Sequence, residues 1–557
     1  MSRSNKPPAP ANPTDPTVDT VVDDAIDVGS EVPTDGSGIR EDRSPASEYL
    51  LDRLLYKGIL PRYAFPTDVA TFFVFDIDKS TVYKTAFRYT PSQGLALALS
   101  QYAPGKEVWI AGKLFVSGAI YSPVSSDRYH AWQQRRLYYE CGVCHYARTQ
   151  LLTEGSKGER LDCPACGRQA TLGEARFWLR PPGFAHPVST PERTSSDDPA
   201  EKSYATRAKL MAPSPSDPSK WISVTPQLRH YHLKNHLLVT NRGPRDEGYH
   251  YCTKCGVIEP SAAPQHTVFA AHSKPYPSGK EPNCPGDATS TGIVLGTDFI
   301  TDVLLVSLTV ASPHRLSPGI LATDVALRTA SEAIAKAACE LLELEIQELQ
   351  AEFRPALTED GQRGIEAEIY LYDTLPGGAG FAKQAGKLGK ALFERAVRVL
   401  EQCPDNCDRS CYRCLRSYKN KFEHDLLDRH VGAALLRHVL TGEAITLPPK
   451  RVQQALDKLY YDLLRSNDPA IKVERAVSNS IPGLGVVTAP ILVSGKGQQL
   501  IIDVSRPLCI DVPTHEELVD VREFSATPLL TVDELIVRRN LPRASAKILS
   551  AFGLADG

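Results

Sequence analysis

Cysteine is the residue type whose spacing most directly indicates chemistry in this chain, which has 557 residues and 13 cysteines. Eleven of the cysteines fall in three close groups, while Cys339 and Cys509 stand alone. The sequence shows neither an apolar run long enough to span a membrane nor an apolar leader, so we expect a cytoplasmic, reducing location. There, grouped cysteines indicate bound metal rather than disulfides, and isolated ones are typical of buried packing residues.

The first group is a pair of CxxC motifs, Cys141-x2-Cys144 and Cys163-x2-Cys166, with eighteen residues between them. This spacing is typical of four thiolates around one tetrahedral zinc ion. A ribbon of this length has too little core to fold alone, so the metal would supply its folding free energy. Because sulfur fills all four positions, the site is predicted to be structural.

Another group, Cys403, Cys407, Cys411 and Cys414, lies within twelve residues between two expected helices. The segment "CPDNCDRSCYRC" is too polar to bury four free cysteines, so it predicts a metal site. Zinc fits such a set, and an iron–sulfur cluster is the alternative. Either metal would fix the geometry of a helix–turn–helix corner.

Basic and aromatic residues surround this corner, where guanidinium and ammonium groups suit phosphates and aromatic rings suit nucleic-acid bases. Asp405, Asp408 and Glu423 dilute the positive charge, so a solvated, charge-balanced surface is the alternative. The candidate nucleic-acid-binding residues are Arg409, Tyr412, Arg413, Arg416, Tyr418, Lys419 and Lys421.

The third metal candidate begins with a single CxxC motif, Cys252-x2-Cys255. Sixteen residues separate Cys255 from His272, and eleven separate His272 from Cys284, which completes a three-sulfur, one-nitrogen set of the kind that binds structural zinc. His266 is a rival for the nitrogen position. In all, the sequence predicts about three zinc sites.

Motifs for phosphate and nuclease chemistry are weak or absent. No GxxxxGK[ST] loop occurs in the sequence. In "YLYDTLPGGAGFAKQ", Asp373 ends an expected strand and glycines open a helix; a tight structural turn is favoured over a phosphate contact. His232-x-Lys234 resembles part of a nuclease motif, but the alternation around it favours an ordinary strand.

Strands and helices that would position these groups follow from periodicity. A helix is expected over 44–58, strands over 67–78 and 291–310, a hairpin around Gly112, and further strands over 345–353 and 367–375. Helices are expected over 322–342, 382–403 and 424–440, and strands over 487–495 and 498–505. The expected fold is α+β and multidomain, with zinc-ribbon-like insertions and a helical four-cysteine cluster.

Domain boundaries are read from composition. We expect a disordered acidic tail over 1–44, a strand-rich region with the first zinc ribbon over 45–182, and a linker over 183–220. A zinc-binding domain over 221–447 and a small α+β module over 448–557 would follow. The net charge of −3 means that any nucleic-acid contact must come from a local patch.

"EIYLYDTLPGGAGFA", followed by a helix and the four-cysteine segment, resembles the C-terminal zinc-binding domain of MrfA-like (YprA-like) superfamily 2 helicases. It is also similar to DrmB of the DISARM antiphage system. Upstream stretches such as "RRLYYECGVCHYA" and "LGTDFITDVLLV" extend the resemblance to roughly 46–440. The family's zinc ligands correspond to Cys403, Cys407, Cys411 and Cys414. Those helicases place ATP-hydrolysing domains ahead of this region, and this sequence has no counterpart of them there.

The resemblance implies a zinc-binding, DNA-binding and docking module that works with a separate helicase motor in DNA repair or phage defence, without catalysis of its own. Single-stranded or forked DNA is the expected ligand, and no membrane partner is expected. One alternative is a metal-dependent nuclease in 448–557, with carboxylates such as Asp503 and Glu516. A structural zinc adaptor and a helicase fragment are further alternatives.

Overall fold

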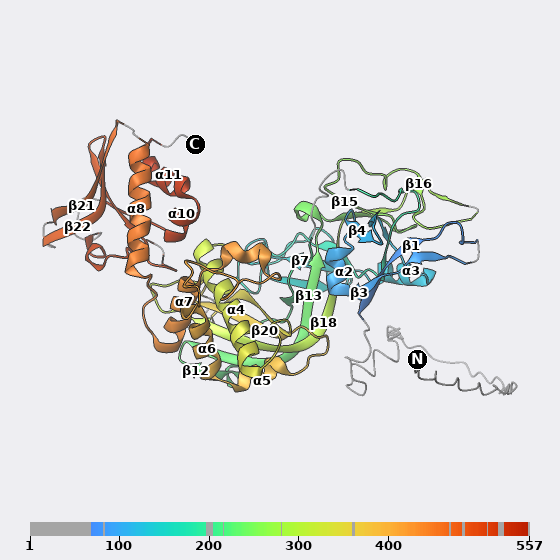
Figure 1. Cartoon of the computed structure of the whole chain (residues 1–557), viewed down its shortest axis with the longest axis horizontal. Helices are drawn as coiled ribbons and strands as arrows, with labels where there is room; N and C mark the ends of the chain where they lie inside the picture. Colours follow the sequence, from blue (N-terminus) through green and yellow to red (C-terminus); the bar gives the residue numbers. More distant parts are fainter. Residues whose placement is uncertain are drawn as a thin grey trace, which may run out of the picture. The chain divides into compact units, whose positions relative to one another are not determined.

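A very long strand organises the centre of this protein. The computed structural model describes residues 68–81, 84–195, 204–215, 217–279, 281–358, 362–466, 469–481, 485–509, 511–521 and 528–554, all within one compact unit of the chain. Strand β18 (Thr289–Thr309) is 21 residues long. It pairs antiparallel with β13 (Leu228–Asn241) on one side and with β20 (Glu366–Asp373) on the other, as Figure 1 shows.

β18 belongs to an 11-stranded sheet. Its partners change along its length: β20 pairs with the carboxyl half, and β9 and β14 pair with the amino half. The sheet therefore links the region of the Cys141–Cys166 and Cys252–Cys284 groups to the region of the Cys403–Cys414 group. Its other strands are β7 (Arg136–Glu140), β8 (Ala147–Gln150), β9 (Arg176–Leu179), β11 (Lys209–Leu210), β12 (Ile222–Thr225), β14 (Tyr249–Cys252), β15 (Ile258–Pro260) and β19 (Leu349–Ala356).

Alternation along the central strands produces two apolar layers, because successive side chains of a strand point to opposite faces. Leu304 and Val306 join the main core, in which helices α4, α6 and α7 cover the sheet. Leu305 and Tyr370 join a second core on the opposite face. The helices here are α4 (Leu321–Leu342), α5 (Phe381–Lys387), α6 (Lys390–Glu401) and α7 (Arg429–Thr441), with the 3-10 turn η4 (Lys421–Leu426) before α7.

Smaller sheets are formed by strands that precede those of the large sheet in the sequence or lie between them. A five-stranded sheet contains β1 (Val69–Phe75), β2 (Phe87–Tyr89), β3 (Ser92–Gly94), β6 (Ala119–Ile120) and β10 (Phe184–Ala185). Two-stranded pairs are β4 (Glu107–Ile110) with β5 (Lys113–Val116) and β16 (His272–Ser273) with β17 (Asn283–Cys284). Short helical elements are α2 (Leu95–Gln101), α3 (Ser125–Gln133), η2 (Pro218–Lys220) and η3 (Pro244–Asp246).

The carboxyl-terminal module has its own four-stranded sheet in the order β21-β22-β23-β24. Apolar residues of its helix α8, such as Leu459, and of its strands, such as Ile502, nevertheless continue the main core. The elements are α8 (Pro449–Arg465), β21 (Ile471–Ile481), β22 (Gly485–Gly495), β23 (Gln498–Val504), η5 (Glu516–Leu518), β24 (Leu529–Val532), α10 (Glu534–Arg539) and α11 (Leu541–Ala551).

Most elements expected from periodicity are confirmed, and the α+β class is correct. The hairpin around Gly112 forms as β4 and β5, with positive φ at Ala111 (49°) and Gly112 (75°), as a tight two-residue hairpin turn requires. The expected tail over 1–44 and helix over 44–58 lie outside the described residues. The domain boundaries stay predictions, although β10 and β11 are strands within the expected linker.

Two helix predictions were wrong in their limits. The helix expected over 382–403 is divided into α5 and α6, because Gly389 has φ 52° and ψ −129°, a conformation outside the helical region. The helix expected over 424–440 starts only at Arg429. Asp428 caps it by accepting hydrogen bonds from the backbone N–H groups of His430 and Val431.

Candidate metal centres and nucleic-acid surface

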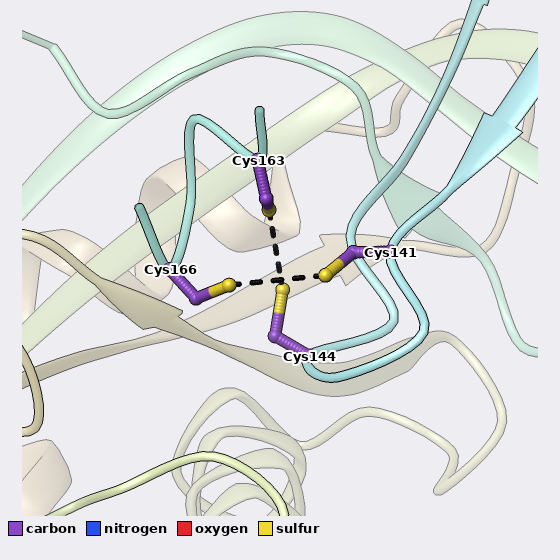
Figure 2. Close-up of side chains that lie close together, drawn as sticks. All are labelled: Cys141, Cys144, Cys163 and Cys166. Carbon is purple, nitrogen blue, oxygen red and sulfur yellow. Dashed lines mark hydrogen bonds between the residues drawn. The ribbon is translucent and has the colours of Figure 1, made fainter. Parts of the chain in front are cut away.

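The first cysteine group converges as its spacing predicts. Cys141 and Cys144 lie on a turn after β7, and Cys163 and Cys166 lie on a second turn that faces it; all four sulfurs point toward one another (Figure 2). Their Sγ atoms are 3.8 Å apart for Cys141 and Cys166 and 3.5 Å apart for Cys144 and Cys163. The backbone N–H of Val143 also points at the Cys141 sulfur, at 3.4 Å.

These distances fit a metal rather than a disulfide. Four sulfurs at about 2.3 Å from a tetrahedral zinc ion lie roughly 3.8 Å from one another, whereas bonded sulfurs lie about 2.0 Å apart. All thirteen cysteines are free thiols. The donor atoms of each of three sets lie within 4.8 Å of one another among the described residues, so each set could hold one zinc ion. The sets are Cys141–Cys144–Cys163–Cys166, Cys252–Cys255–His272–Cys284 and Cys403–Cys407–Cys411–Cys414.

In the mixed set the structure brings His272, and not its rival His266, to the sulfurs. His272 Nε2 lies 3.1 Å from Cys255 Sγ, and Cys252 Sγ lies 3.6 Å from Cys284 Sγ. The other ring nitrogen, Nδ1, donates to the carbonyl oxygen of Ala270 at 2.8 Å. That hydrogen bond orients the imidazole and leaves Nε2 free to bind a metal, which is typical of zinc-binding histidines.

His266 lies elsewhere. Its Nδ1 is 3.7 Å from Glu259 Oε2, and its ring packs against His250 and Phe269. Pairing of β16 with β17 places His272 directly opposite Cys284, which accounts for the choice of histidine. The sequence could not supply this register, because both strands are only two residues long.

The four-cysteine corner, residues 403–414, follows directly after α6. The Sγ–Sγ distances are 3.5 Å for Cys403–Cys411, 3.6 Å for Cys403–Cys407 and 3.7 Å for Cys407–Cys414. The backbone N–H of Cys411 donates to the Cys414 sulfur at 3.1 Å. These distances again match a tetrahedral zinc site.

Side chains from two helices hold the corner in place. Arg429, at the start of α7, donates from Nε to the Cys407 carbonyl oxygen at 2.7 Å and from Nη2 to Asn406 Oδ1 at 2.9 Å. Lys336 of α4 donates from Nζ to the carbonyl oxygen of Cys414 at 2.6 Å. The corner is therefore attached to the helices of the main core by charge-assisted hydrogen bonds.

The seven basic and aromatic candidates all lie on or just after this corner, but their surroundings differ. Tyr412 and Tyr418 are 69% and 78% exposed. Arg413 forms a surface ion pair with Asp405 at 3.2 Å, and Arg409 pairs with Asp425 at 3.5 Å. The two pairs show that carboxylates do offset part of the positive charge, as expected.

The remaining candidates are Arg416, Lys419 and Lys421. Arg416 Nε donates to Ser410 Oγ at 2.9 Å, so it supports the corner from within. Lys419 is exposed, and its pKa is lowered by desolvation and by the nearby Arg207. Lys421 Nζ donates to Tyr418 Oη at 3.1 Å, and this contact lowers the pKa of Tyr418.

Distant parts of the chain add aromatic and basic groups to this site. We call Lys106, Tyr204, Tyr418, Lys421 and Phe422 the corner surface. The rings of Tyr204 and Phe422 have centroids 4.6 Å apart. Lys421 Nζ lies 4.2 Å from the Tyr418 ring centroid and 4.9 Å from that of Phe422, and Lys106 Nζ lies 4.9 Å from that of Tyr204.

Three of these five residues were missed from the sequence. Phe422 is adjacent to Lys421, so an exposed aromatic residue next to a lysine was a usable signal. Tyr204 and Lys106 carried no local signal, because only the tertiary fold brings them to the corner. Phe422 is 63% exposed, and a large ring exposed to that degree contributes little to the core.

Beneath this surface lies a buried ion network. Arg328 donates from both Nη atoms to Glu352 at 2.7 Å, and Arg207 Nη1 donates to the same carboxylate at 3.0 Å. Burial favours the neutral acid, but the two guanidinium groups outweigh it and lower the pKa of Glu352. Glu423 is close to the same arginines, yet burial dominates there and raises its pKa.

Another buried network connects the corner to the carboxyl-terminal module. Arg451 of α8 is 4% exposed and makes two hydrogen bonds of 2.7 Å to Asp428 and two of 2.7 Å to Glu534. Arg538 of α10 reaches the corner itself, with Nη1 2.7 Å from Asp408 Oδ2. Asp428 thus serves both as the cap of α7 and as the partner of Arg451.

The glycine motif before α5 is a structural turn in this protein. Asp373 accepts hydrogen bonds from the backbone N–H groups of Ala379, Phe381 and Ala382, at 2.6, 3.1 and 2.7 Å. Its carboxylate therefore occupies the position at the helix start where a phosphate would otherwise bind. Burial raises the pKa of Asp373, although these three hydrogen bonds oppose the shift.

The nuclease-like signals are also accounted for. His232 and Lys234 lie within β13, and His232 Nε2 is 3.0 Å from Asp302 Oδ1. Asp503 is fully buried and paired with His515 Nδ1 at 2.9 Å, while the Glu516 carboxylate is 90% exposed. Neither carboxylate belongs to a cluster of metal-ligating groups within the described parts of the chain.

Comparison with known proteins gives one domain match and one curated relative. Residues 330–415 match the model of the MrfA Zn-binding domain. This span runs from within α4 to the residue after Cys414, so it contains all four cysteines of the corner. Over 545 residues the chain is 30% identical to Druantia protein DruE of Escherichia coli (strain UMEA 4076-1). The alignment covers 90% of this chain and 27% of that protein.

A search of solved structures finds the crystal structure of the DUF1998 helicase MrfA bound to DNA, at 10% identity and a TM-score of 0.30. The match covers 66% of this chain and 34% of the MrfA chain. A TM-score this low supports no inference about mechanism. Among the described residues no helix is long and apolar enough to cross a membrane. The chain therefore contains an MrfA Zn-binding domain, built around the four-cysteine corner, and is homologous to about a quarter of DruE.

Proposed function

We propose that this chain is a zinc-stabilised module that binds single-stranded or forked DNA and docks a helicase motor, in DNA repair or phage defence. The corner surface carries the proposal. It presents exposed aromatic rings, on which bases can stack, beside lysine ammonium groups that suit phosphates. The MrfA Zn-binding domain and the similarity to DruE support a helicase-related role.

One zinc ion in each of the three donor sets would hold this surface in shape. With four protein ligands each, the ions would be structural and leave no open position for a substrate. Metal analysis of the purified chain is expected to give three zinc ions per molecule. A ratio below three, after purification without chelator, would show that at least one set does not retain the metal.

DNA binding is tested with labelled single-stranded and forked oligonucleotides and fluorescence anisotropy. Binding should be sensitive to salt and largely independent of sequence. Tyr418→Ala and Phe422→Ala should each weaken it, because a stacked base contributes about 1–3 kcal/mol, or roughly 5- to 150-fold. Tyr129→Ala is the matched control, since Tyr129 is a 62% exposed tyrosine on α3.

Failure of the unaltered chain to bind single-stranded, forked or duplex DNA at about 50 mM salt would remove the DNA part of the proposal. The docking part has a separate test, a pull-down from native cells followed by an ATPase assay. Recovery of a DNA-stimulated ATPase whose unwinding requires this chain supports docking. Recovery of no motor by a chain that holds its zinc favours a structural adaptor.

A further inference from the structure

A polar pocket opens beside the first zinc set, away from the corner surface. Its volume is about 480 Å³, and it lies between β7, the start of β9 and the end of β13. Cys141 lines one wall of the pocket, so the turn of the first zinc set shapes it. The charged residues that matter here are Glu140, Arg160, Glu174, Arg176, Arg242 and Asp246.

At the pocket floor, Glu140 is surrounded by more positive charge than it can neutralise. Its side chain is 8% exposed; it accepts a hydrogen bond from Lys209 Nζ at 2.6 Å and forms an ion pair with Arg242 Nη1 at 2.7 Å. The Tyr138 hydroxyl donates to the same carboxylate. His145 Nδ1 lies 3.3 Å from the same carboxylate. One ionised carboxylate is thus shared by two cationic side chains.

Arg176 adds a positive charge without a matching carboxylate. Its Nη1 donates to the backbone carbonyl oxygen of Asp246 at 2.7 Å, and no carboxylate of the described residues forms an ion pair with it. Burial and the nearby Arg242 lower its pKa, while Tyr138, Glu140 and Asp246 oppose the shift. A partly buried guanidinium group beside another cation is stabilised by an anion.

Arg242 also has unused hydrogen-bonding capacity. Its Nε is buried without a partner, and its Nη2 pairs with the exposed Asp246 at 3.1 Å. A pair with one exposed member is weak in water. Arg176 and Arg242 therefore face one buried carboxylate, which Lys209 also contacts, and one exposed carboxylate.

At the rim of the pocket, Arg160 and Glu174 pair at 2.5 Å, with side chains 58% and 61% exposed. They add no net charge. Arg160 thus provides a matched comparison for Arg176: both are arginines of the same pocket, and only Arg160 has a carboxylate partner of its own.

We propose that this pocket binds a phosphate group, carried by a nucleotide or by a phosphorylated end of a nucleic-acid strand, through Arg176 and Arg242. Guanidinium groups match phosphate oxygens with paired hydrogen bonds. The volume lies within the range of about 300–1,000 Å³ of small-molecule sites. The inference does not depend on DNA binding at the corner surface.

Isothermal titration calorimetry of the zinc-loaded full chain tests the pocket. The probes are inorganic phosphate and dAMP, and deoxyadenosine is the phosphate-free control for dAMP. Oligonucleotides with a 5′-phosphate are then compared with the same strands ending in a hydroxyl. Phosphate-bearing probes should bind more tightly than their phosphate-free partners. A preference confined to dAMP assigns the pocket to nucleotides, and one seen with oligonucleotides assigns it to strand ends.

Arg176→Ala should weaken binding of the phosphate-bearing probe by about tenfold or more, since a hydrogen bond to a charged group contributes roughly 1.5–3 kcal/mol. Arg160→Ala should leave affinity within about threefold of the unaltered chain, because Arg160 already has a partner. Equal affinity for phosphate-bearing and phosphate-free probes, or an unchanged affinity in Arg176→Ala, would overturn the proposal.

Zinc content verifies that Arg176→Ala keeps its fold. If that variant loses zinc, Arg176→Lys is used in its place to test the pocket, because it keeps the charge but loses the paired hydrogen bonds. Weaker binding than in Arg160→Ala then supports the pocket, and equal binding overturns it. A chain that binds dAMP but no DNA would contradict the proposed function and leave the pocket standing. Binding of DNA without any preference for phosphate-bearing probes would contradict the pocket proposal and leave the proposed function standing.

Discussion

The first cysteine set and the four-cysteine corner each offer a metal four cysteine sulfurs, but the surroundings of the two sites are very different. Cys141, Cys163 and Cys166 belong to a small apolar cluster of their own, which β7 and the two turns of the ribbon supply. Cys403 and Cys414 belong to the main core, together with helices α4, α6 and α7. The ribbon is therefore a local unit, whereas the corner is continuous with the centre of the protein.

This difference shows that one kind of metal site can have two mechanical roles. At the ribbon, the metal would substitute for a core too small to fold by itself. At the corner, it would fix a loop that also anchors Arg429 and Asp408, and through Asp408 the carboxyl-terminal module. Loss of metal should remain local in the first case and spread in the second.

Replacement of a ligand in each set should produce the largest difference. Cys414→Ser is expected to cost on the order of 4 kcal/mol or more in unfolding free energy, because the loss of metal opens the main core. Cys163→Ser should release one zinc ion and expose the 141–172 segment to proteolysis, with a smaller effect on the global transition. Zinc analysis, limited proteolysis and denaturant unfolding measure the three effects. Equal losses of stability would contradict the comparison.

Arg451→Met tests the connection between the corner and the carboxyl-terminal module. It leaves Asp428 buried without its cation, while Glu534 keeps its ion pair with Arg538, so we expect a loss of about 3–5 kcal/mol in unfolding free energy. Zinc content should remain three, since no ligand is touched. A loss below about 1 kcal/mol would show that the module is not held to the corner through this network.

Arg413→Ala separates surface charge from stability at the same corner. Both side chains of its ion pair with Asp405 are exposed, so the free energy of unfolding should change by less than about 1 kcal/mol. If Arg413 contacts a phosphate, the slope of log affinity for DNA against log salt should fall by about one. An unchanged slope would leave Tyr418, Lys421 and Phe422 as the DNA contacts to pursue.

The smallest expected effect is on the pH dependence of stability, in which a histidine of the carboxyl-terminal module and a histidine near the main core should differ. A hydrogen bond to Asp503 raises the pKa of His515, although partial burial opposes the shift. The folded state thus binds the proton more tightly than the unfolded state. This contribution is complete below the unfolded pKa near 6.5 and is lost as pH rises through the higher folded pKa.

His314, in the main core, should behave in the opposite way, because burial lowers its pKa. Its contribution weakens as pH falls below 6.5, where the unfolded state takes up the proton. The measurement is the urea midpoint between pH 5.5 and 8.5 for the unaltered chain and for His515→Gln. The variant should lose stability mainly at the acidic end. A constant difference across this range would show that the Asp503 contact does not stabilise the protonated form.

The sequence by itself determined the features whose cause is local. The spacing of Cys141, Cys144, Cys163 and Cys166 predicted their convergence, because a CxxC turn places two sulfurs together wherever it occurs. Alternation and helical periodicity likewise located β18 and α4. Long, strongly periodic elements are specified by neighbours along the chain, so they can be read without knowledge of the fold.

Tertiary structure decided which distant residues meet. Pairing of β16 with β17 selected His272 over His266, and the fold placed Tyr204 against Phe422 and Lys106 against Tyr204. The phosphate pocket likewise joins residues more than 60 positions apart, such as Arg176 and Arg242. Such contacts depend on the packing of whole sheets and helices, a balance of burial and chain entropy that local spacing does not encode.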